Sequence, residues 1–183
     1  VPGKDLIMDV LQTARARHSY RKDFLSTPVP REHLTQILQA ALTSPTGCNA
    51  QTTKFVAVDD PNKLAALSAL TGQRYTATAT AAILVFTKVT PTYKGNSYHV
   101  QDYAAAVQTI LLALTELGYA SCWVEGQIQE NGIAQKMAQV VEAPADMELA
   151  VYLPLGVPAQ AVAGVSKVAF DQRAWFNRYG QDA

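Results

Sequence analysis

Cysteine is scarce in this sequence: Cys48 and Cys122 are the only two among 183 residues, and they lie far apart with no CxxC pairing. Two such thiols supply neither a disulfide framework nor a cysteine-based zinc site, which favours a reducing, cytoplasmic setting. Histidine is almost as sparse. His18, His33 and His99 share no spacing typical of metal ligands, so we expect no metal site.

Charge is also low. Charged residues make up 16% of the chain, hydrophobic residues make up 49%, and the formal net charge is zero. A neutral chain does not attract a polyanion, so we expect no nucleic-acid partner. No apolar run approaches the roughly 20 residues of a membrane-spanning helix, and no charged leader precedes one, so we expect no membrane partner. The length predicts one domain, residues 4–183, with Val1-Pro2-Gly3 left out.

Glycine-rich phosphate loops are missing as well, since the sequence contains neither GxGxxG nor GxxxxGK[ST]. A nicotinamide-binding Rossmann fold or a P-loop is therefore not supported, and a nucleotide-like cofactor would be held in another way. Cys48 and His18 could in principle form a nucleophile–base pair if the fold brought them together. A lone cysteine in a loop of small residues is more often structural, which is the interpretation we favour.

Hydrophobic periodicity is the strongest positive signal. It predicts helices over residues 4–16, 30–42, 61–70, 99–117 and 128–141, and strands over 55–58, 83–86, 120–124 and 148–153. This alternation predicts an α+β or α/β fold with one sheet and helices against it. The helix over 100–117 is more apolar than one face against a sheet requires. Burial against a second subunit and deep burial within one chain both account for the excess.

The pentapeptide Arg17-His18-Ser19-Tyr20-Arg21 carries two guanidinium groups and a hydroxyl just after a predicted helix. In an extended segment side chains alternate, so Arg17, Ser19 and Arg21 would project to one side as a clamp for one phosphate. The alternative is that these cations complement the dipole at the helix C-terminus.

Two further loops could approach a ligand. The run LTSPTGCNAQ, residues 42–51, has few large side chains between apolar segments, which suits either a solvated loop or close approach of the backbone to a ligand. Glu125-Gly126 follows a predicted strand, where a glycine marks either close ligand approach or a plain turn.

The motifs become more informative when they are taken in order: RHSYR at 17–21, PVPREHLTQILQAALTSPTGCNAQ at 28–51, HVQDYAAAVQTILLALTELGYASCWVEG at 99–126, LPLGVP at 153–158 and a late FNRYG. Together they resemble the nitroreductase family of flavin enzymes over about residues 10 to 180. The resemblance implies an α+β fold, a mixed sheet flanked by helices, built as an intertwined homodimer with FMN bound at the subunit interface.

The resemblance also implies which residues contact the cofactor. The FMN phosphate and ribityl chain would be held by Arg17, His18, Ser19 and Arg21, with the late Lys167 completing the phosphate site. The isoalloxazine of the partner subunit's flavin would be contacted by Pro45, Thr46, Gly47 and Asn49. The pyrimidine edge would be bonded by Gln73, and flavin N5 would be faced by Glu125 and Gly126. No side chain is assigned a catalytic role, because the flavin carries the hydride chemistry.

The activity implied is that of an FMN-dependent NAD(P)H oxidoreductase, passing hydride by a ping-pong mechanism to a small electron-poor acceptor such as a nitroaromatic or a quinone. Two alternatives stay open: a relative with other flavin chemistry (enone reduction, dehalogenation or flavin degradation), and a flavin store or sensor with little turnover. The chain departs from the family pattern at Thr52-Thr53, where many relatives have proline and an aromatic residue, and at Lys167, where they often have two cations.

Overall fold

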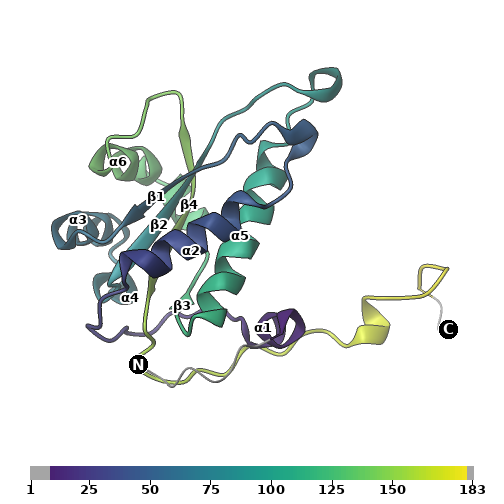
Figure 1. Ribbon diagram of the computed structural model, residues 1–183, viewed down its shortest axis with the longest axis horizontal. Helices are drawn as coiled ribbons and strands as arrows, with labels where there is room; N and C mark the ends of the chain where they lie inside the picture. The colour runs from purple at the N-terminus through teal and green to yellow at the C-terminus, as the bar shows by residue number, and fades with distance from the viewer. Residues whose placement is uncertain (1–8, 181–183) are drawn as a thin grey trace.

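The computed structural model describes residues 9–180 and is built around a four-stranded sheet in the order β1-β2-β4-β3 (Figure 1). The strands are β1 (Lys54–Val58), β2 (Ala81–Thr87), β3 (Ala120–Ser121) and β4 (Glu148–Gly156). Every pair of neighbouring strands is antiparallel. Of the two fold classes that the sequence predicts, the structure is therefore the α+β one.

Helices cover both faces of the sheet, and the alternation of side chains along β2 explains why. Ile83 and Val85 belong to the core shared with α2 (Arg31–Leu42) and α5 (His99–Glu116). Leu84 and Phe86 face the core shared with α3 (Pro61–Thr71) and α6 (Ile133–Val140). All seven residues of β2 are buried, as the continuous apolar run predicts for a central strand.

The long helix predicted over 99–117 is confirmed as α5. Gly118 follows it with φ of +78°, the left-handed conformation in which glycine commonly ends a helix. α5 packs against α2 and the sheet along the face that includes Val107, Ile110 and Leu114. This placement sets one end of α5 beside residues 45–52 and the other beside residues 16–20.

The segment after α5 differs from its prediction. The strand expected over 120–124 is reduced to β3 and an isolated bridge between Val124 and Tyr152. The helix expected over 128–141 is broken into a 3-10 turn, η3 (Gly126–Gln129), and α6. Asn131 and Gly132 between them have positive φ, and this interrupts the helix. The short helix α4 (Arg74–Ala77) and the 3-10 turns η1 (Gly47–Asn49) and η2 (Tyr93–Gly95) were not predicted.

The first helix has an apolar face that the other described residues leave exposed. α1 (Val10–Ala16) is capped by the side chain of Asp9. It is the described part of the helix predicted over 4–16, of which residues 4–8 lie outside the described residues. Val10 and Leu11 are 70% and 62% exposed, although their spacing predicts a buried face. α1 contacts α5 through Thr13, whose hydroxyl donates to Glu116 at 2.8 Å.

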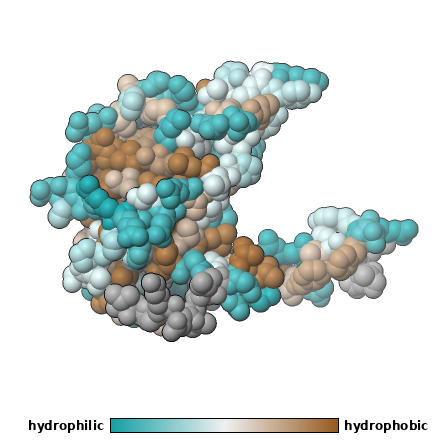
Figure 2. All heavy atoms as spheres, viewed as in Figure 1, coloured by the Kyte–Doolittle hydropathy of each residue, from teal (hydrophilic) through white to brown (hydrophobic). Residues whose placement is uncertain are grey.

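A C-terminal arm, residues 163–180, leads away from the sheet and its helices (Figure 1). It includes the 3-10 turn η4 (Phe170–Gln172). Its aromatic side chains form two ring pairs, Phe170 with Phe176 and Trp175 with Tyr179. Most of the arm's apolar side chains are exposed, and Figure 2 shows an open hollow between the arm and the body. No helix within residues 9–180 is both long and apolar enough to cross a membrane.

Candidate functional site

The segment that carries the predicted phosphate clamp is fixed to the edge of the sheet. Ser19 forms a parallel bridge with Ser121, and the Tyr20 amide donates to the Ser121 carbonyl at 2.8 Å. Tyr20 is buried, whereas Ser19 and Arg21 are exposed. The segment therefore alternates as an extended chain does, with the side chains of Ser19 and Arg21 on the side away from the core.

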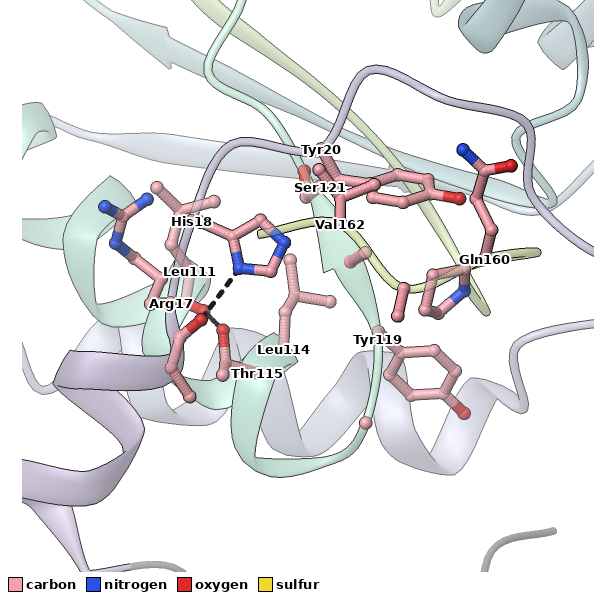
Figure 3. Close-up of a pocket in the computed structure, with 15 residues that line it drawn as sticks. Arg17, His18, Tyr20, Leu111, Leu114, Thr115, Tyr119, Ser121, Gln160 and Val162 are labelled. Atoms are coloured by element: carbon pink, nitrogen blue, oxygen red, sulfur yellow. Dashed lines mark hydrogen bonds between the residues drawn. The ribbon is translucent and has the colours of Figure 1, made fainter. Parts of the chain in front are cut away.

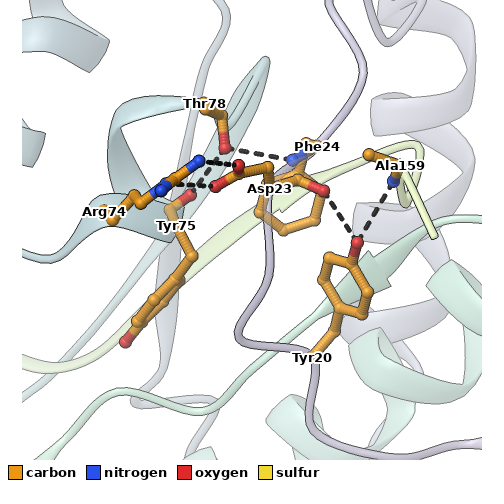
Figure 4. Close-up of polar contacts among 7 residues, drawn as sticks. All are labelled: Tyr20, Asp23, Phe24, Arg74, Tyr75, Thr78 and Ala159. Carbon is orange, nitrogen blue, oxygen red and sulfur yellow. Dashed lines mark hydrogen bonds and ion pairs between the residues drawn. The ribbon is translucent and has the colours of Figure 1, made fainter. Parts of the chain in front are cut away.

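A polar network holds the same segment against α4 and the chain beyond β4 (Figure 4). Arg74 donates two hydrogen bonds to the Asp23 carboxylate, at 2.7 and 3.1 Å. The Phe24 amide donates to the Thr78 hydroxyl at 3.0 Å. The Tyr20 hydroxyl donates to the Asp23 carbonyl and accepts from the Ala159 amide. These contacts attach residues 17–24 to a rigid frame, which suits the positioning of a bound ligand.

Arg17 and Arg21 differ from the arginines that have a structural partner. Arg31 and Arg74 each form a two-bond pair with a carboxylate. The guanidinium of Arg17 has no hydrogen bond or ion pair to any residue within 9–180, and that of Arg21 has no carboxylate partner in that range. Two guanidinium groups without a carboxylate partner, beside a serine hydroxyl, suit an anion such as a phosphate.

Arg21 lies beside the hydroxyl of Tyr75. Burial raises the pKa of Tyr75 to about 12, and the neighbouring Cys122 thiol adds to this, while Arg21 opposes the rise. Burial likewise raises the pKa of the Cys122 thiol, which keeps it protonated and a poor nucleophile. This side of the site therefore offers positive charge and neutral donors.

His18 points to the other side of the segment. Its Nδ1 lies 2.8 Å from the Ala16 carbonyl, and its ring faces a cavity of about 290 Å³ that Tyr20 and Leu114 also line. Figure 3 shows the imidazole turned toward this cavity and the guanidinium of Arg17 directed away from it. The structure therefore does not bring the His18 side chain together with Ser19 and Arg21.

Glu125 and Gly126 lie where the chain leaves the sheet. Both carboxylate oxygens of Glu125 are engaged, because Tyr103 donates to one at 2.8 Å and Trp123 Nε1 donates to the other at 2.7 Å. Burial is the main cause that raises the pKa of Tyr103 to about 12, and the hydrogen bond to Glu125 adds to it. Tyr103 therefore stays a donor near neutral pH. A Cβ built at Gly126 would meet nothing within 4 Å, so open space adjoins the backbone there.

Gln73 is brought close to the same place. It occupies the N-cap position of α4, and its backbone amide donates to the Thr71 hydroxyl at 3.4 Å. Gln127, the residue after Gly126, donates through Nε2 to the Thr71 carbonyl at 2.7 Å. Residues 71–75, 121–127 and 17–24 thus form one assembly around the candidate site.

Pro45, Thr46, Gly47 and Asn49 lie apart from Arg17 and Ser19 in the protomer. The Gly47 amide donates to Asp102, in the first turn of α5, whereas the cavity beside Arg17 is lined by Leu114, near the other end of that helix. At a rise of about 1.5 Å per residue, Asp102 and Leu114 are roughly 18 Å apart along the axis. This separation also leaves Cys48 and His18 toward opposite ends of α5, so they do not form the pair considered above.

Lys167 lies in the exposed arm and has no hydrogen bond or ion pair to the other described residues. The arm begins beside the clamp segment, because a Cβ at Gly164 would lie 3.5 Å from the Cβ of His18. Sequence reasoning missed the supporting residues Tyr103, Trp123 and Asp102. Only Asp102 carried a signal, as a carboxylate within a largely apolar helix.

These groups fit a flavin mononucleotide. Arg17, Arg21 and Ser19 supply donors for a phosphate, and the open backbone at Gly126 leaves room for a flat ring. Gln73 adds an amide able both to donate and to accept at the edge of such a ring. No carboxylate of the assembly is left to repel the phosphate, since Asp23 and Glu125 are engaged by neighbouring donors.

Comparison with known proteins gives one family. A model of the nitroreductase family matches residues 14–78 and 67–157. The Bacillus subtilis protein named "Putative NAD(P)H nitroreductase YdgI" is 28% identical over 142 residues, which are 76% of this chain and 60% of that protein. The chain therefore spans about 60% of the length of this relative, less than two thirds of it.

Solved structures show the same fold. An FMN-dependent nitroreductase from Clostridium difficile R20291 superposes with a TM-score of 0.77 at 23% identity, over 92% of this chain and 99% of the other. A BluB-like flavoprotein from Clostridium difficile 630 gives 0.79 at 22% identity, over 93% and 100%. The predicted α+β fold of this family, with its sheet flanked by helices, is thus confirmed.

Proposed function

The chain belongs to the nitroreductase family, and we propose that it is an FMN-dependent NAD(P)H oxidoreductase that reduces nitroaromatics, quinones or similar electron-poor acceptors. The names of its relatives support an oxidoreductase. When bound, FMN would supply the hydride-transfer chemistry, through N5, that links NAD(P)H to the acceptor in a ping-pong cycle.

One observation carries this proposal: Arg17 and Arg21 flank Ser19 on a segment fixed to the sheet, and neither arginine has a carboxylate partner within residues 9–180. An arginine left without a counter-ion beside a structured edge is available for an anionic ligand. Arg17, Ser19 and Arg21 would hold the phosphate, with Lys167 as an added cation and His18 contributing through its backbone.

The other residues orient the ring. Tyr103 and Trp123 hold the Glu125 side chain, and open space adjoins the backbone at Gly126, where the reactive edge of the ring would lie. Gln73 would bond the pyrimidine edge. Backbone and amide donors at this place would stabilise the negative charge that a reduced flavin carries. We assign no side chain a proton-transfer role.

The site would be completed by a second copy of the chain. Pro45, Thr46, Gly47 and Asn49 lie toward the far end of α5 from Arg17, so in our proposal they contact the flavin of the partner subunit. The uncovered apolar face of α1 and the exposed apolar arm support a homodimer, because both would be buried by a partner.

A comparison of two flavins tests the phosphate clamp. Riboflavin has the same ring as FMN and no phosphate, and a charged hydrogen bond contributes about 1.5–3 kcal/mol, so FMN should bind at least roughly tenfold more tightly. The measurement is titration of flavin fluorescence with the apoprotein, at two salt concentrations. Equal affinities for FMN and riboflavin would show that residues 17–21 are not a phosphate site.

A further inference from the structure

The segment from η1 to the start of β1 has an unusual backbone. Cys48, Asn49 and Gln51 all have φ between 50° and 53°, the left-handed region that side chains other than glycine rarely adopt. Residues are kept in such conformations only when the surrounding contacts determine them. Something must therefore hold the turn formed by residues 48–51.

A single buried carboxylate spans this turn. Asp102 is 3% exposed, and its Oδ1 accepts from the Gly47 amide at 2.8 Å. Its Oδ2 accepts from the Thr52 hydroxyl at 3.0 Å. Gly47 precedes the left-handed residues and Thr52 follows them, so the two hydrogen bonds fix both ends of the turn to the first turn of α5.

Two other contacts act on the same loop. The Gln51 amide donates to the Thr46 hydroxyl at 3.1 Å, which ties the ends of the turn to each other. Gly47 is packed so closely against Tyr98 that a Cβ would lie 2.6 Å from the tyrosine side chain. The loop is thus pressed onto α5 by packing and attached to it by the carboxylate.

We propose that Asp102 and Thr52 form a clasp that positions the turn of residues 48–51, and so presents Asn49 to the flavin. This role rests on the proposed function. Thr52 stands where many relatives of the family have proline. In this chain a hydroxyl bonded to a buried carboxylate restricts the loop in place of a proline ring. Both are positioning residues, because both are buried and act through the loop that they hold.

The adjacent threonine supplies a matched control. Thr52 and Thr53 are 7% and 8% exposed, but the hydroxyl of Thr53 has no hydrogen-bond partner among the described residues. Valine replaces threonine with the same shape and no hydroxyl, so Thr52→Val and Thr53→Val differ in one respect: only the first opens the clasp. Thr52→Ser keeps the hydroxyl and should behave as the wild type.

The first readout is amide hydrogen exchange of the apoprotein over residues 46–53. We expect severalfold faster exchange in Thr52→Val and no change in Thr52→Ser or Thr53→Val. In an Asp102→Ala background, Thr52→Val should add no further acceleration, because the two residues act through one contact. Equal exchange in Thr52→Val and Thr53→Val would overturn the clasp.

The second readout is FMN affinity. Loss of one hydrogen bond from the loop should weaken FMN binding roughly 3- to 10-fold in Thr52→Val and leave the other two variants at the wild-type value. Faster exchange with unchanged FMN affinity would overturn the positioning role. If the wild-type protein bound no FMN, the proposed function would fail and the positioning role with it, whereas the exchange comparison would still decide whether the clasp exists.

Discussion

Replacing Arg17 with alanine should weaken FMN binding by about 1.5–3 kcal/mol, or roughly 10- to 150-fold, the scale of a charged hydrogen bond to phosphate. The Arg17 side chain has no hydrogen bond or ion pair within residues 9–180, so its removal breaks no contact of that kind there. The fold should therefore stay intact while the affinity falls. Titration of flavin fluorescence with the apoprotein measures the effect, with circular dichroism as the check on folding.

Two companion variants sharpen this result. Arg17→Lys keeps the charge and loses the planar fork, so its affinity should lie between those of wild type and Arg17→Ala. Arg31→Ala is the matched control, because the Arg31 guanidinium is paired with Asp59 at the surface, away from the assembly around Ser19. If Arg17→Ala bound FMN as tightly as Arg31→Ala, the assignment of the phosphate site would be wrong.

Removing the arm after Gly164 should convert a dimer into a monomer and abolish tight FMN binding. The arm carries large apolar side chains that the protomer leaves exposed: Val165, Val168, Phe170, Phe176 and Tyr179. Each would contribute about 1.5–3 kcal/mol if fully buried against a partner. Light scattering during size-exclusion chromatography at low micromolar concentration gives the mass, and the retained flavin absorbance gives the occupancy.

A point variant separates the role of the arm's apolar side chains from that of its length. Phe170 and Phe176 lie as a ring pair with centroids 6.3 Å apart, and Phe170→Ser/Phe176→Ser should also shift the protein toward monomer. Gln172→Ser, a polar change in the same arm, should leave the dimer unchanged. A full-length protein that is a monomer at these concentrations would contradict the shared site.

The parts of the fold that could be predicted are those with a strong local signal. β2 could be predicted because a fully buried strand is apolar at every position, and α5 because its apolar face repeats over 18 residues and ends at Gly118. The broken helix after Gly126 could not, since Asn131 and Gly132 interrupt an otherwise helical pattern through their φ angles. The exposed face of α1 could not either, because periodicity predicts an apolar face and does not say which chain covers it.

The candidate site divides in the same way. Alternation along residues 17–21 predicted that Ser19 and Arg21 share a side, and the buried Tyr20 agrees with it. Alternation did not predict that Arg17 and Arg21 lack carboxylate partners. Ion pairs depend on residues that are distant in sequence, as the pair between Asp23 and Arg74 shows. Asp102 could not be assigned for the same reason: its partners Gly47 and Thr52 are about fifty residues away. The flavin contacts assigned to all of the site residues, including Pro45–Asn49 and Lys167, stay predictions.

The central claim is that this chain binds FMN and passes electrons through it, and an absorbance spectrum followed by an anaerobic titration tests it most directly. The purified protein, or the protein after addition of FMN, should show flavin absorbance that NADH or NADPH bleaches and that a nitroaromatic or a quinone restores. A yellow protein inert to both nicotinamides would instead indicate a flavin store or sensor. A colourless protein that rejects added FMN would contradict the account altogether.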